Sequence, residues 1–68
     1  MKTERNLERA ARARLNQAQA KADALIVEIE NIRSGGFTKE GMAEMRDLAN
    51  EIAQCIHEYN AYINAART

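Results

Sequence analysis

The feature that most constrains the fold of this chain is a heptad repeat of apolar residues that is interrupted once, near the middle. In each half, the apolar positions recur at alternating spacings of four and three, which is the spacing of one helix face packed on another helix. The first stripe consists of Ala11, Leu15, Ala18, Ala22, Leu25, Ile29 and Ile32. The second consists of Met42, Met45, Ala49, Ile52, Ile56, Tyr59, Ile63 and Ala66. The pattern predicts an all-α fold in which two long helices form an antiparallel hairpin.

The residues around the interruption predict where the helices end. Glycine just past a last turn can adopt the left-handed conformation that closes a helix, so we expect a first helix over about 4–33 and a turn over 34–37. Thr38 is the expected N-cap of a second helix over about 39–66. Gly41 is unfavourable inside a helix by roughly 1 kcal/mol, which indicates either a close backbone approach or an unoptimised position.

The length of the chain predicts a small free energy of unfolding. Its 68 residues suit one helical hairpin domain spanning 1–68, and a domain of this size buries only about 60% of the surface that its unfolded chain exposes. Such domains usually add a disulfide, a metal or self-association. The single Cys55 cannot form an internal disulfide, and together with His57 it offers too few ligands for structural zinc. We therefore expect no cofactor, and we expect association to supply the missing stability.

The second helix carries an additional apolar line beside its main stripe. Leu48, Cys55 and Tyr62 recur at a spacing of seven, and a two-helix seam that uses two positions in seven is not expected to cover them. A second copy of the chain is the simplest partner that could bury this line, which predicts a homodimer that forms a four-helix bundle. The expected oligomer or partner interface comprises Leu48, Cys55, Tyr62, Ile52, Ile56 and Tyr59.

Charge is distributed unevenly although the formal net charge is zero. Residues 1–21 contain six basic and two acidic side chains, and residues 22–68 contain four basic and eight acidic ones. Two kinds of partner, nucleic acid or an acidic protein surface, suit the arginines of the basic part, which are Arg5, Arg9, Arg12 and Arg14. No aromatic residue is interleaved with these arginines to stack on bases, so nucleic acid is the less favoured of the two.

Motifs that carry chemistry are lacking in this sequence. We find no phosphate-binding loop, nucleophile elbow or paired-carboxylate cleft, so we expect neither enzymatic activity nor a small-molecule substrate. A carboxylate stripe at helical spacing is expected to be a solvated face and not a metal site; it consists of Glu40, Glu44, Asp47 and Glu51. The opening residues are charged, and no apolar run approaches the roughly 20 residues needed to cross a bilayer, which predicts a cytoplasmic protein.

Three stretches give the chain a likeness to known proteins. They are the Arg/Ala/Gln-rich segment 5–19, the Ser34-Gly35-Gly36 turn and the end segment 62–67. In these stretches and in size, the chain resembles small accessory helical proteins encoded in the early regions of lambdoid temperate phages. The resemblance implies a regulator that alters host physiology or the choice between lysis and lysogeny by binding a host or phage protein.

A second likeness concerns the turn. Residues 32–37, with Glu40, resemble the small subunit of exodeoxyribonuclease VII, which is also a helical hairpin. The chain departs from that family at 38–39, at Gly41 and at Met45. We therefore favour a non-enzymatic protein-interaction module. Two alternatives stay open, namely a small structural subunit of a larger enzyme and a nucleic-acid-associated protein that uses its basic first helix.

Overall fold

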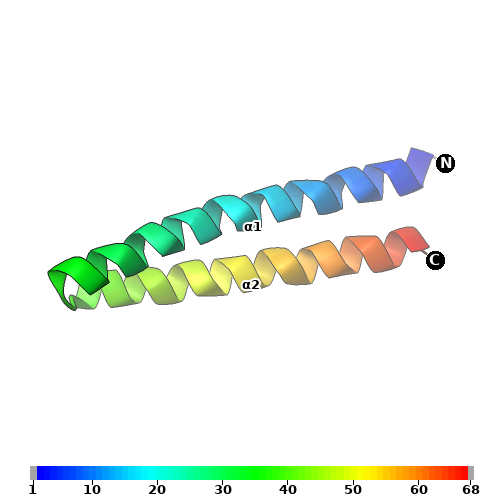
Figure 1. Cartoon of the computed structure of the whole chain (residues 1–68). Helices are drawn as coiled ribbons and strands as arrows, with labels where there is room; N and C mark the ends of the chain where they lie inside the picture. The colour runs from blue at the N-terminus through cyan, green and yellow to red at the C-terminus, as the bar shows by residue number, and fades with distance from the viewer. Residues whose placement is uncertain (1, 68) are drawn as a thin grey trace.

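The computed structural model describes residues 2–67, with side chains for 5–67, and consists of two helices that lie side by side (Figure 1). Helix α1 spans Lys2–Gly35 and helix α2 spans Lys39–Arg67. The two chain ends lie at the same end of a rod that measures 51 × 14 × 12 Å (Figure 1). The prediction of two helices packed into an all-α hairpin is confirmed.

The turn begins with a glycine cap on α1. Gly36 adopts a positive φ of 94°, and its amide donates a hydrogen bond to the carbonyl oxygen of Ile32 at 2.8 Å. This single bond between residues four apart is the αL form of a helix C-cap, and glycine supplies the conformation without the steric cost of a Cβ. Helix α1 therefore ends at Gly35, two residues beyond the end that we expected.

Helix α2 begins with the predicted threonine cap. The hydroxyl oxygen of Thr38 accepts a hydrogen bond from the amide of Gly41 at 2.9 Å, which satisfies one of the otherwise unpaired donors in the first turn. A Cβ on Gly41 would lie 2.9 Å from Thr38 Oγ1, 3.0 Å from Glu28 Oε1 and 3.5 Å from Ile32 Cδ1. A side chain at this position would therefore crowd the threonine cap and the carboxylate of Glu28.

Three pairs of side chains that meet across the hairpin define its register. They are Arg14 with Glu58, Lys21 with Glu51, and Glu28 with Glu44. Each step from one pair to the next moves seven residues along α1 and seven residues back along α2. This regular step is the expected consequence of two antiparallel helices that pack through heptad positions.

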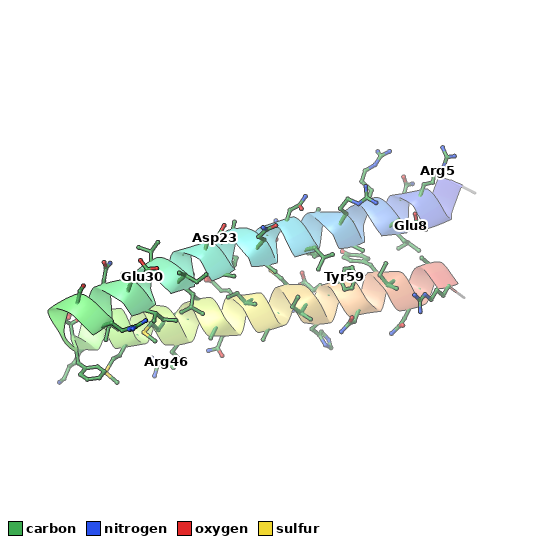
Figure 2. All side chains as sticks on the ribbon, viewed as in Figure 1. Arg5, Glu8, Asp23, Glu30, Arg46 and Tyr59 are labelled. Carbon is green, nitrogen blue, oxygen red and sulfur yellow. The ribbon has the colours of Figure 1, made fainter. Side chains whose placement is uncertain are left out.

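The core of the hairpin is narrow. Among the described side chains, the buried apolar ones are Ala11, Ala18 and Cys55, with exposed fractions of 1%, 6% and 6%. Larger side chains of the seam are only partly buried, because two helices cannot surround them; these include Leu7, Leu25, Ile32, Leu48, Ile52, Tyr59 and Tyr62. Figure 2 shows Tyr59 directed into the space between the helices, whereas Arg5 extends away from α2.

The side of α2 that faces α1 differs from the one that we expected. The line of Leu48, Cys55 and Tyr62, which we expected to lie outside the seam, is part of it, since Cys55 is only 6% exposed. Met42 and Ile56, which we assigned to the seam, are instead 56% and 39% exposed. The apolar positions of α2 form three adjacent lines, and the seam includes the line that carries Gly41, on which Gly41 and Cys55 are buried.

Candidate interaction surface

The side chains left outside the seam gather on one side of the hairpin. At the open end, a groove is lined by Glu8, Ala11 and Leu15 of α1 and by Tyr59, Ile63 and Ala66 of α2. Leu15 and Ile63 therefore flank the seam on the same side. Because heptad lines run along each helix, the residues spaced by seven from Leu15 and from Ile63 extend this side toward the turn.

We call this side the apolar face. Its members on both helices are Leu15, Ala22, Ile29, Met42, Ala49, Ile56 and Ile63, together with Ile26, which lies on the next heptad line of α1. Five of the larger ones are well exposed, at 39% for Leu15, 52% for Ile26, 37% for Ile29, 56% for Met42 and 39% for Ile56. Single exposed apolar residues are ordinary, but a continuous run along a whole face marks a site of interaction.

Basic side chains border the apolar face on both helices. On each helix, the heptad line next to the apolar face and further from the seam carries basic residues. These residues form the cationic rim, which consists of Arg5, Arg12, Arg33, Lys39, Arg46 and Arg67, all exposed. Arg12 and Arg67 also line the groove at the open end, which places them beside Leu15 and Ile63. The rim holds six of the ten basic residues of the chain, and within residues 5–67 no ion pair involves them. The charge that borders the apolar face is therefore mainly cationic, with Glu8 as an acidic residue in the groove at the open end.

The opposite side of the hairpin carries the cross-helix charged pairs. Arg14 Nε lies 3.3 Å from Glu58 Oε1, and its guanidinium also donates a hydrogen bond to Gln17 Oε1 at 2.9 Å. Lys21 Nζ lies 3.3 Å from Glu51 Oε1. All these charged side chains are one-third to one-half exposed, so each pair contributes a few tenths of a kcal/mol, up to about 1 kcal/mol.

The third pair breaks the pattern because it consists of two carboxyl groups. A hydrogen bond from Glu28 to Glu44 raises the pKa of Glu28 above its ordinary value of 4.5, and partial burial and the charge of Glu44 act in the same direction. Glu44 and Glu51 also line a shallow hollow with Asp47 on this side. The side opposite the apolar face is therefore acidic, and the hairpin has two chemically distinct faces.

The structure separates the six residues that we expected to form an interface. Leu48, Cys55, Tyr62, Ile52 and Tyr59 are buried or partly buried along the hairpin seam, and only Ile56 lies on the apolar face. Cys55 is enclosed there, with its Sγ 3.9 Å from Gln17 Oε1. Our sequence reasoning missed Leu15, Ile29 and Met42 as exposed residues, because their seven-residue spacing also fits a hairpin seam.

The four arginines that we expected to form a basic contact do not share one surface. Arg5 and Arg12 belong to the cationic rim, whereas Arg9 lies on the side of α1 that faces away from α2. Arg14 is engaged with Glu58 on the acidic side. The basic surface that the structure presents is therefore the rim, which draws on both helices.

The described part of the chain has further features that bear on function. No group of three or more His, Cys, Asp or Glu side chains there is arranged to hold a metal ion. His57 is exposed on α2. Neither helix, over its described residues, has a segment both long and apolar enough to span a bilayer. Comparison of the chain with protein-family models, with curated proteins and with solved structures found no match.

Proposed function

We propose that this chain is a non-enzymatic protein-interaction module that binds further helices across its apolar face. The observation that carries the proposal is the contrast between a core of three buried apolar side chains and a face with five well-exposed large ones. Two more helices laid on that face would complete a four-helix bundle and turn the face into a second core. The two helices can come from a second copy or from a partner protein.

The expected gain in free energy is large for a chain of this size. Full burial of a large aliphatic side chain contributes about 1.5–3 kcal/mol, and these side chains are already roughly half covered, so each would gain on the order of 1 kcal/mol. Five such residues would together gain on the order of 5 kcal/mol before the cost of association. That is similar to the whole stability of a small domain, about 5 kcal/mol.

This mode of action also fits the resemblance to phage accessory proteins. A regulator without an active site acts by occupying a surface of its target, and an extended helical face is a common means of doing so. A host or phage protein with an amphipathic helix would be the partner under this proposal.

The test uses two neighbouring residues on different sides of α1. Ile26, on the apolar face, is 52% exposed, and Val27, which faces away from it, is 57% exposed. We expect Ile26→Glu to weaken association at least about tenfold, roughly 1.4 kcal/mol, while Val27→Glu leaves it unchanged. Association is measured by sedimentation equilibrium of the chain alone and by titration with synthetic heptad peptides, one bearing Glu and one bearing Lys beside its apolar stripe. A chain that stays monomeric and binds neither peptide would contradict the proposal.

A further inference from the structure

We infer that the apolar face receives an acidic amphipathic helical segment of another protein and not a second copy of this chain. This inference rests on the proposed function and adds the chemistry of the partner. It is carried by the charge that borders the face, since the six residues of the cationic rim flank it on both helices. No Asp or Glu lies on either rim line within the described residues; one carboxylate, Glu8, lies on the line of Leu15 and lines the groove at the open end.

Charge at the flanking positions of a helical bundle decides which helices pair. Side chains beside an apolar stripe meet their counterparts on the facing helix, so opposite charges favour a pairing and like charges oppose it. Two copies packed face to face would bring one cationic rim against another. An acidic helix would instead pair with the rim, so the same apolar contact is favoured with one partner and opposed with the other.

The rim also indicates how the acidic residues of the partner are arranged. Arg33, Lys39 and Arg46 gather near the turn, whereas Arg5, Arg12 and Arg67 gather at the open end. The rim positions between these groups are uncharged and are occupied by Gln19, Ile26, Ala53 and Asn60. The 21 residues from Arg12 to Arg33 span roughly 31 Å of helix. The complementary segment therefore has acidic residues near both ends and uncharged flanking positions in the middle, over about six turns.

The heptad order of the apolar face favours a helix over an anionic lipid surface. Ala22 and Ala49 stand seven residues from larger side chains on either side, such as Leu15 and Ile56. A side chain of a facing helix inserts into a hole formed by four residues, and a small residue at the edge of that hole leaves room for a larger side chain. Binding to a lipid surface depends on the buried apolar area and on charge. Alanine contributes little to that area, and lipid binding does not require apolar residues to recur every seven positions.

The experiment measures binding of the whole chain to the Glu-flanked and Lys-flanked heptad peptides, each of about 28 residues. We expect the Glu-flanked peptide to bind at least about tenfold more tightly in roughly 0.05 M salt, and we expect the preference to shrink at roughly 0.5 M salt as the charges are screened. Combining Arg33→Glu with Arg46→Glu should reduce the preference, because four of the six rim cations remain. Arg9→Glu is the matched control, because it reverses a charge on the far side of α1, and it should preserve the preference.

Four outcomes would overturn the inference. Equal binding of the two peptides would refute the role of charge but leave helix docking, and hence the proposed function, intact. A dimer that persists on dilution at low salt would show that a second copy is the occupant. Binding to phosphatidylglycerol vesicles without binding to either peptide would assign the face to a lipid surface. A chain that binds neither peptide, neither vesicles nor itself, would refute the proposed function as well.

Discussion

Reversing the charge of Lys21 should destabilise the hairpin by about 1 kcal/mol. Lys21 Nζ lies 3.3 Å from Glu51 Oε1, and the two side chains are 34% and 50% exposed. Opposite charges at about 4 Å in water attract by roughly 1 kcal/mol, and the entropy cost of ordering two long side chains leaves about 0.5 kcal/mol of that gain. Lys21→Glu replaces this attraction by a repulsion of similar size. The expected loss lowers the melting temperature by about 4–8 °C.

The assay is thermal unfolding followed by far-UV circular dichroism, at a protein concentration where the chain has a single association state. The double variant Lys21→Glu/Glu51→Lys restores the pair in the opposite order, so its melting temperature should return close to that of the wild type. Near 1 M salt, where the Debye length is about 3 Å, the loss in the single variant should shrink by more than half. Arg9→Glu, which makes the same change of charge on the outer side of α1, should have little effect.

The reasoning would be refuted if the single variant melted like the wild type, or if the double variant remained as unstable as the single one. The first result would mean that the pair contributes nothing across the seam. The second would mean that Lys21 stabilises the hairpin by other means, such as the packing of its aliphatic stem. A loss that persisted in 1 M salt would point to the same explanation.

Three further changes test other parts of the structure. Thr38→Ala should cost about 1 kcal/mol by removing the cap of α2, and Thr38→Ser should keep most of that stability; both are measured by thermal unfolding. Cys55→Asp should abolish the helical signal in circular dichroism, because it buries a carboxylate in the seam, whereas Ile56→Asp on the apolar face should retain it. Glu28→Gln should raise the melting temperature at pH 7. Stability from the proton that Glu28 holds is fully present below pH 4.5 and is lost as the pH rises through the raised pKa, so this gain should shrink on acidification.

Local signals in the sequence were enough to predict the hairpin and its turn. The glycines after Arg33 and the threonine at position 38 act on the backbone within a few residues, and the structure contains both the positive φ of Gly36 and the cap at Thr38. The heptad spacing predicted the two helices because a regular apolar stripe has few other uses. For Gly41 the sequence posed a close backbone approach or an unoptimised position, and the atoms that a Cβ would meet there belong to the side chains of Thr38, Glu28 and Ile32.

The exposed face could not be derived from apolar spacing alone. On α2, the line of Leu48, Cys55 and Tyr62 and the line of Met42, Ile56 and Ile63 flank a shared middle line, and both are apolar. The distinguishing signal lies in residues that are far apart in sequence. Arg14 and Lys21 are spaced by seven, as are Glu51 and Glu58, and only one rotation of α2 brings the two sets together.

Because α2 could bury either of two apolar lines against α1, weak interactions on the surface can decide which line is buried. Rotating α2 by one heptad line would bury Met42 and Ile56 in place of Leu48 and Cys55, so the loss and gain of apolar contact would largely cancel. The same rotation would separate both ion pairs, at a cost of about 1 kcal/mol in total, which corresponds to roughly a fivefold preference. Charged pairs on one side of the hairpin therefore help to determine which apolar residues are presented to a partner on the other.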